Sequence, residues 1–286
     1  MKPAPFAYAK ARSLDHAVML LRENESARVL AGGQSLMATL NMRLDAPKLL
    51  VDINGLPGLD AITVKDGKVE IGALVRTATA LRSAVIAEHV PLFAMALPHI
   101  GHAAIRNRGT IGGSIAFADP AAELPACLLA LGGEVEIAGA EGRRKVPADD
   151  FFRGLFDTAL AADEVLTAIR VPTATAAMRY GFAELARRHG DYAMVGLAAS
   201  ARKDRDSLSD ARLVFFGIGA TPVRAHNAEA ALAGLSPGGK AIDEAVQALA
   251  HDLDPSDDIH ARAKTRLHLA GVLLKRVIAQ LRGETA

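Results

Sequence analysis

Two pairs of adjacent glycines constrain the fold of this chain more than any other feature of its sequence. They stand in Ala31-Gly-Gly-Gln-Ser-Leu36 and in Gly109-Thr-Ile-Gly-Gly-Ser114. Because glycine has no Cβ, such pairs adopt backbone conformations closed to other residues, and consecutive amides can then point at one anionic oxygen group. We therefore expect two glycine turns, with Ser35, Thr110 and Ser114 as additional hydrogen-bond donors. Two such turns can share one pyrophosphate.

The glycine pairs do not by themselves require a bound nucleotide. Either pair alone is explained equally well by a tight turn that serves folding only. Neither pair fits the G-x-G-x-x-G pattern of Rossmann sites, and no glycine run ends in the Gly-Lys-Ser/Thr of phosphate loops. His99-Ile-Gly-His102 spells a tetrapeptide of one aminoacyl-tRNA synthetase class, but it follows an apolar helix and the matching Lys-Met-Ser-Lys-Ser loop is missing from the sequence. These two histidines also lack further ligands at motif spacing, so we expect no metal site.

Charge and cysteine content exclude several classes of function. The sequence has 33 basic and 32 acidic residues, so it offers no broad positive field for nucleic acid. No stretch approaches the roughly 20 apolar residues of a membrane span, and the N-terminus lacks the apolar run of a secretory signal, so a cytoplasmic protein is expected. The single cysteine, Cys127, lies in an apolar helical run and is expected to be a buried thiol. It cannot form a four-thiolate cluster, so any iron–sulfur chemistry belongs to another chain.

Hydrophobic periodicity predicts an α+β fold in two units that meet near residue 175. In the first unit Ser13 is expected to cap a helix, and Asp66-Gly67 to turn a hairpin between strands. The remaining elements expected there are strands over 28–31, 49–53, 134–137 and 164–171, and helices over 35–44, 77–89, 92–107 with a break at Pro98, and 121–131. The elements expected in the second unit are strands over 178–185, 193–201 and 211–219, a solvated loop over 203–210, and helices over 227–233, 241–252 and 259–281.

Taken together, four segments resemble one known family. They are Ala31–Leu36, Ile100–Ser114, Ala118–Pro125 and Arg187–Val195. In order and spacing they are similar to the medium, FAD-binding subunit of the carbon monoxide dehydrogenase and xanthine dehydrogenase family, over essentially the full length. The resemblance implies an α+β fold, with a two-part FAD-binding domain of the vanillyl-alcohol-oxidase type over 1–175. A small flavoprotein C-terminal domain with a three-stranded sheet and helices is implied over 176–286.

The resemblance also implies the cofactor contacts, residue by residue. The two glycine segments would hold the FAD pyrophosphate and ribityl chain, and Glu123 would lie near ribityl or ribose hydroxyls. Asp119 is placed to accept bonds from sugar hydroxyls, although helix capping alone would explain it. Tyr192 would shield the isoalloxazine face, although a tyrosine that begins a strand is often just part of a core. The expected cofactor-binding residues are Ala31, Gly32, Gly33, Gln34, Ser35, Leu36, Ile100, Gly101, Thr110, Ile111, Gly112, Gly113, Ser114, Asp119, Glu123, Leu166 and Tyr192.

The function implied by the resemblance is electron transfer. A large partner subunit with molybdopterin cytosine dinucleotide would hydroxylate the substrate, and a small partner subunit with two [2Fe–2S] clusters would relay electrons. FAD on this chain would pass them to an external acceptor, which is left open among oxygen, quinone, NAD and a carrier protein. No catalytic acid, base, nucleophile or metal is then required on this chain. The implied assembly is a dimer of heterotrimers.

The substrate class and two competing functions stay open. N-heterocycles, aldehydes and CO are all substrates implied by the family, and Gln34 favours an organic one because carbon monoxide dehydrogenases often carry histidine there. A related branch that reduces aromatic thioesters needs a cysteine-rich insertion, which a chain with one cysteine lacks. The first competing function is a self-contained flavin oxidase of the same FAD fold. The second is a cofactor-free scaffold in which the glycine turns serve folding only.

Overall fold

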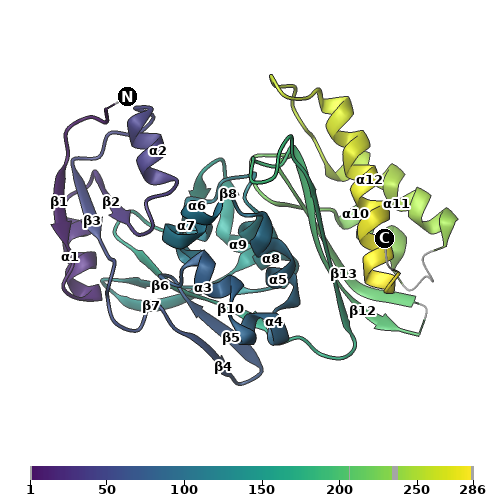
Figure 1. Cartoon of the computed structure of the whole chain (residues 1–286), viewed down its shortest axis with the longest axis horizontal. Coiled ribbons are helices and arrows are strands. Elements are labelled where there is room, and N and C mark those ends of the chain that lie inside the picture. Colours follow the sequence, from purple (N-terminus) through teal and green to yellow (C-terminus); the bar gives the residue numbers. More distant parts are fainter. Residues whose placement is uncertain (1, 206, 234–237, 285–286) are drawn as a thin grey trace.

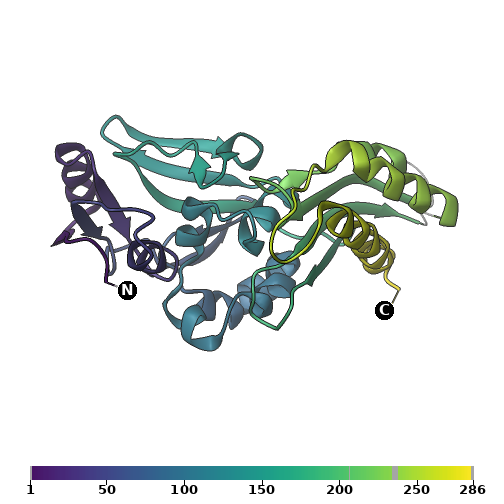
Figure 2. The ribbon, with the colours of Figure 1, turned by 90° about the horizontal axis from the view of Figure 1, so that it is seen from above.

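Three larger sheets follow one another along the molecule, from the N-terminal end to the C-terminal helices (Figure 1). The same succession is seen from above, where the first two sheets are joined to the third by a group of short helices (Figure 2). The structure is a computed structural model and describes residues 2–205, 207–233 and 238–284. No helix in these ranges is long and apolar enough to cross a membrane.

The first sheet is a small parallel sheet with one helix packed on it. Its strands, in spatial order, are β1 (Ala7–Lys10), β3 (Leu49–Asp52) and β2 (Ala27–Leu30). Helix α1 (Leu14–Glu23) buries Ala17, Val18 and Leu21 against this part of the chain. The Ser13 hydroxyl accepts from the His16 N–H at 3.1 Å, which confirms the predicted cap.

The second sheet is antiparallel and lies in the middle of the molecule. Its strands, in spatial order, are β4 (Ile62–Lys65), β5 (Lys68–Gly72), β10 (Val165–Pro172), β6 (Glu134–Gly139) and β7 (Gly142–Pro147). Asp66 and Gly67 have φ of 50° and 71°, as a tight hairpin turn requires, so the predicted hairpin is confirmed. On central strand β10, Arg170 pairs with Glu70 of β5 at 2.6 Å and with Glu136 of β6 at 2.9 Å.

Short helices cover this sheet, and they are more fragmented than the sequence predicted. The helix expected over 77–89 is broken at Ser83, whose hydroxyl accepts from the Ile86 N–H and starts a new helix. The helix expected over 92–107 ends near Pro98, as predicted, and its second part is separate. Helix α2 (Leu36–Asn41) lies beside the first sheet (Figure 1). The helices of the middle region are α3 (Thr77–Leu81), α4 (Ala84–His89), α5 (Pro91–Ala96), the 3-10 helix η1 (Leu97–His99), α6 (Ala103–Arg108), α7 (Ile111–Phe117), α8 (Glu123–Ala130) and α9 (Ala148–Phe151).

The third sheet has both of its faces buried. Phe216 and its neighbours on one face join the core around α5 and α8, whereas Phe215 and its neighbours on the other face pack against the C-terminal helices. This alternation follows from the two-residue period of a strand. The strands, in order, are β11 (Met178–Leu185), β12 (Val195–Asp204), β13 (Ser207–Phe216) and β14 (Val223–Arg224), and the helices are α10 (His226–Leu232), α11 (Gly239–Asp252) and α12 (Ala263–Arg282).

The α+β class is confirmed, with some local corrections. The solvated loop predicted over 203–210 is largely strand, since β12 runs to Asp204 and β13 begins at Ser207; residue 206 lies outside the described residues. Strands β1 and β7 were not predicted, because Ala7–Lys10 is short and Gly142–Pro147 is mostly charged and exposed. Short β14 adds a fourth strand to the predicted three, and β8 (Phe152–Gly154) pairs with β9 (Asp157–Thr158) in a small hairpin.

Candidate cofactor site

The first glycine pair forms a loop between β2 and α2. Gly33 has a φ of +72°, a conformation that favours glycine. Gly32 is needed for a different reason, because a Cβ there would lie 2.4 Å from the Arg108 carbonyl oxygen. Among the described residues, the backbone N–H groups of Gly33, Gln34 and Ser35 have no protein acceptor. The loop therefore presents consecutive free donors, as the sequence predicted.

The second glycine pair is not a turn, which corrects the prediction. Gly112 and Gly113 lie in the first turn of α7, where the Thr110 hydroxyl accepts from the Gly113 N–H at 3.1 Å. Gly112 is required by close packing, since a Cβ there would lie 2.5 Å from the Cβ of Ala73. Sequence reasoning missed this because a glycine pair looks the same whether it supplies a positive φ or a close helix approach.

A chain of polar contacts holds the two glycine segments together. The Asn54 side-chain amide donates to the Ala31 carbonyl at 2.8 Å, immediately before the first pair. Arg76 donates to the Asn54 side-chain oxygen at 2.7 Å and also to the Arg108 carbonyl, immediately before the second segment. Arg108 is thus contacted from both sides, by Arg76 and by the close approach of Gly32. These contacts fix the distance between the two segments.

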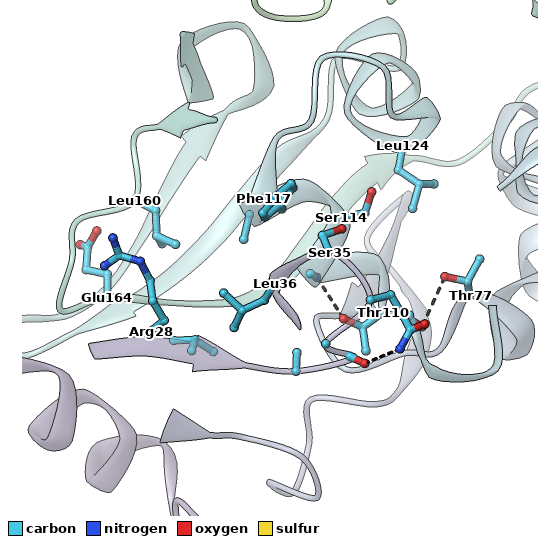
Figure 3. A pocket seen from close by; sticks show the side chains of 18 of the residues that line it. Arg28, Ser35, Leu36, Thr77, Thr110, Ser114, Phe117, Leu124, Leu160 and Glu164 are labelled. Atoms are coloured by element: carbon cyan, nitrogen blue, oxygen red, sulfur yellow. Dashed lines mark hydrogen bonds between the residues drawn. The ribbon is translucent and has the colours of Figure 1, made fainter. Parts of the chain in front are cut away.

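Between the two segments lies a pocket of about 330 Å³. Figure 3 shows Ser35 and Ser114 near its middle, with Arg28, Leu160 and Glu164 at one end. The sequence-predicted residues that line it are Ala31, Gly32, Gly33, Gln34, Ser35, Leu36, Ile100, Thr110, Gly113 and Ser114. Most of the predicted glycine-segment residues therefore meet at one cavity, which mixes free amides and hydroxyls with apolar walls.

Seven predicted residues lie outside the lining of this pocket. Ile111, Gly112 and Leu166 are buried within the fold, and Gly101 has a positive φ at the start of the segment that leads to α6. Asp119 and Tyr192 line a neighbouring hollow of about 490 Å³. Glu123 begins α8, one residue before pocket-lining Leu124. For these seven, as for the ten that line the pocket, contact with the cofactor stays a prediction.

The pocket also contains residues that sequence reasoning missed. Arg28 on β2 points along the pocket and pairs with Asp45, Nε to Oδ2, at 2.9 Å. Glu164 is bound by Arg144 at 2.6 Å, and this partner lowers the pKa of the Glu164 carboxyl. Thr77, Phe117 and Leu160 are among the other residues that line the pocket. Arg28 could have been suspected from its place just before the glycine loop, whereas the segment around Leu160 carries no motif.

Acidic groups behind the pocket have shifted pKa values. Burial, and then the charges of Glu184 and Asp119, raise the pKa of Glu123 to about 8. Burial likewise raises the pKa of Asp119. The Cys127 thiol is fully buried and its pKa is raised well above the usual value, so it is an inert core group, as predicted. The pocket thus borders one carboxyl, that of Glu123, which holds its proton at neutral pH.

Comparisons with known proteins decide the family. Residues 4–174 match the model of the FAD binding domain in molybdopterin dehydrogenase, and residues 180–281 match that of the CO dehydrogenase flavoprotein C-terminal domain. The chain belongs to the FAD-binding medium subunits of the molybdenum hydroxylases. The predicted family and fold are thereby confirmed, and the chain is an FAD-binding component of an oxidoreductase.

Individual relatives of this medium-subunit family span the whole chain. The nicotine 6-hydroxylase medium subunit of Paenarthrobacter nicotinovorans is 38% identical over 285 residues and covers 100% of both chains. The 6-hydroxypseudooxynicotine dehydrogenase complex subunit alpha of the same organism is 39% identical, over 98% of this chain and 95% of the relative. A structure of carbon monoxide dehydrogenase from Hydrogenophaga pseudoflava superimposes with a TM-score of 0.97 at 35% identity, covering 100% of both chains.

The residues of the pocket fit FAD. A diphosphate needs several N–H donors that converge without a competing protein acceptor, and the loop at Gly33–Ser35 provides them. Hydroxyls of Ser35, Thr110 and Ser114 add donors near the same place, and the apolar walls suit a large aromatic ring system. The glycines leave the pocket wall without side chains where the two segments come closest.

Proposed function

We propose that this chain is the electron-transfer subunit of a three-subunit molybdenum hydroxylase. Electrons removed from the substrate at the molybdopterin cytosine dinucleotide of a large partner subunit pass through two [2Fe–2S] clusters of a small partner subunit. They reach the FAD of this chain and leave to an external acceptor. The observation that supports this most directly is the pocket of free backbone amides between the two glycine segments, in a chain of this family.

The division of labour follows from what this chain can and cannot supply. A bound flavin accepts single electrons from clusters and passes on pairs, while the protein supplies binding, orientation and electrostatics. The single cysteine of the sequence cannot ligate a [2Fe–2S] cluster, so the clusters belong to another chain. We place the diphosphate between Gly32–Leu36 and Thr110–Ser114, and the boundary between the two domains at residues 175 and 176.

We further propose that the substrate of the whole complex is an N-heterocyclic compound. Relatives named for nicotine and for 6-hydroxypseudooxynicotine are 38% and 39% identical, against 33% and 34% for the carbon monoxide dehydrogenase medium chains. Gln34, at the position where carbon monoxide dehydrogenases often carry histidine, agrees with an organic substrate. The substrate binds to the large partner subunit. The sequence of this chain therefore indicates the substrate only through its similarity to the medium subunits of related complexes.

The test uses the complex with this chain in two forms. The complete complex is purified once with FAD on this chain and once after FAD removal, and an N-heterocycle such as nicotine is added. With FAD present, we expect the cluster absorbance to bleach and then recover when an external acceptor is added. Without FAD, bleaching should occur and recovery should be lost. Recovery at the same rate without FAD would contradict the proposal.

The competing function, a self-contained flavin oxidase, makes the opposite prediction. The FAD-loaded chain without partners should leave nicotine, quinoline and aromatic aldehydes unoxidised, as seen from an unchanged flavin absorbance under anaerobic conditions. Steady turnover by the isolated chain would establish the oxidase and reject the electron-transfer role. Native mass measurement of the complex tests the proposed dimer of heterotrimers.

A further inference from the structure

Two successive peptide groups of the first glycine loop share one arrangement of hydrogen bonds. Asn54 donates from Nδ2 to the Ala31 carbonyl at 2.8 Å, and Gln34 donates from Nε2 to the Gly32 carbonyl at 3.1 Å. The N–H groups of the same two peptides belong to Gly32 and Gly33, and neither has a protein acceptor among the residues that the structure describes. Each peptide is therefore held at its carbonyl end by a side chain and is free at its N–H end.

The second glycine segment contains a third peptide group of this kind. The Gly109 carbonyl accepts from the Thr77 N–H at 3.0 Å and from the Thr77 hydroxyl at 3.3 Å. The N–H of this peptide belongs to Thr110 and has no protein acceptor in the described part of the chain. Gly32, Gly33 and Thr110 all line the pocket. Three free donors from two segments therefore border one cavity.

Holding one end of a peptide group fixes the direction of the other end. The peptide group is planar, and the described residues contain no cis peptide bond, so each N–H points opposite to the carbonyl of its own peptide. Gly32 and Thr110 are buried, and buried backbone N–H groups without an acceptor are rare in folded proteins. Packing alone would not favour this arrangement, which leaves the donors for an acceptor from outside the protein.

Asn54 is itself held rigidly, and it lies outside the lining of the pocket. Its Oδ1 accepts from Arg76 Nη2 at 2.7 Å, and its Nδ2 donates to Asp52 Oδ1 at 2.7 Å as well as to Ala31. Asp52 in turn accepts at its other oxygen from the Tyr8 hydroxyl at 2.6 Å. All three hydrogen-bonding positions of the Asn54 amide are thus occupied, so its orientation is fixed before any ligand binds.

We propose that Asn54, Gln34 and Thr77 are positioning residues for the diphosphate of FAD. Each holds the carbonyl end of one peptide group so that the N–H end is directed into the pocket. The inference rests on the placement of the diphosphate proposed above. Donors from two segments suit a ligand with two linked anionic groups. Because the donors are fixed in advance, binding does not have to order them, and this raises affinity.

The test uses Asn54→Ala, because Asn54 does not line the pocket and acts through the peptide that joins Ala31 and Gly32. The Kd for FAD, measured by quenching of flavin fluorescence, should rise roughly two- to twelvefold, as expected for the loss of one hydrogen bond. The Kd for ADP, measured by calorimetry, should rise by the same factor, since ADP carries the diphosphate without the flavin. The phosphorus NMR signals of bound FAD should shift relative to those in the unmodified chain.

Asn24 provides the matched control. Its Nδ2 donates to the Leu20 carbonyl at 2.9 Å at the end of α1, and it does not line the pocket. Asn24→Ala should lower the free energy of unfolding of the FAD-free chain and leave both Kd values and the phosphorus signals unchanged. A second variant, Asn54→Asp, keeps an acceptor for Arg76, which protects the fold, but cannot donate to Ala31. Its Kd for FAD should rise at least as much as in Asn54→Ala.

Three results would overturn the proposal. The first is unchanged Kd values in both Asn54 variants. The second is an equal rise in Asn54→Ala and Asn24→Ala, which would indicate general loosening of the fold. The third is a rise for FAD without a rise for ADP, which would place the effect away from the diphosphate. A failure of the diphosphate placement itself is distinguishable, because it would also leave the Kd unchanged in Gly33→Ala, and electron transfer is measured separately in the complex.

Discussion

Replacement of Gly33 by alanine isolates the contribution of one backbone conformation to FAD binding. Gly33 has a φ of +72°, which costs an L-residue roughly 1–2 kcal/mol relative to glycine. The added methyl group itself is nearly accommodated, because it would lie 3.3 Å from Leu30 Cδ1 and 3.4 Å from Met37 Cγ, which are flexible side-chain atoms. The loop beside the open pocket can relax in the free variant, so the conformational cost should appear when FAD binds.

The expected magnitude follows directly from this cost. A loss of roughly 1–2 kcal/mol corresponds to a rise in the Kd for FAD of roughly five- to thirtyfold. The assay is titration of FAD-free chain into FAD while the quenching of flavin fluorescence is recorded. Gly58→Ala is the matched control: Gly58 has a φ of +78° and open space around it, and it does not line the pocket.

The two variants should behave differently despite the similar backbone penalty. Gly58→Ala should lower the free energy of unfolding of the FAD-free chain and leave the Kd for FAD unchanged. Gly33→Ala should raise the Kd. An unchanged Kd in Gly33→Ala, with Gly58→Ala destabilised as expected, would refute the reasoning that the left-handed glycine shapes the diphosphate cradle.

Two further predictions concern packing and pH. Gly112→Ala should lower the free energy of unfolding by roughly 1–3 kcal/mol in urea titrations, because its Cβ would lie 2.5 Å from the Ala73 Cβ. Gly239→Ala, in open space at the first position of α11, should instead stabilise the chain by roughly 0.4–1 kcal/mol, because alanine has less conformational freedom than glycine in the unfolded chain. N–H groups after Asp258 and the Arg266 guanidinium lower the pKa of Asp258 to about 2 from 3.8, so the stability it contributes is present above about pH 4 and lost as pH falls towards 2. Asp258→Asn should flatten the fall in stability over that window, and an equally steep fall in the variant would contradict this.

Site residues could be predicted where the reason for them is local in the sequence, and could not be predicted where the reason is a contact with a distant residue. The donors at Gly33 and Thr110 were predictable, because glycine pairs and hydroxyl residues are local features of the sequence. The need for glycine at position 112 inside a helix was not, because it comes from close packing on Ala73, about 40 residues away in the chain. Leu160 and Glu164 enter the pocket from a segment without a motif, so only the folded chain brings them there.

The fold shows the same division between local and distant causes. The Ser13 cap and the Asp66-Gly67 turn were read from neighbouring residues, and both are present. The edge strand Gly142–Pro147 escaped notice because it is held by pairing with β6 rather than by an apolar pattern of its own. The buried Glu184, paired with His99 some 85 positions earlier, has no signature in either segment.

Because the third sheet has both faces buried, neither half of this subunit is expected to fold stably without the other. One side of β11–β13 completes the core around α5 and α8, and the Ser200 hydroxyl on β12 donates to the Ala130 carbonyl at 2.7 Å. A chain cut near residue 175 would leave that hydrophobic surface bare, and such a fragment is prone to aggregate. The domain boundary near residue 175 is therefore not a position at which one domain can be exchanged for that of a related enzyme. Chimaeras of this subunit should exchange both halves together.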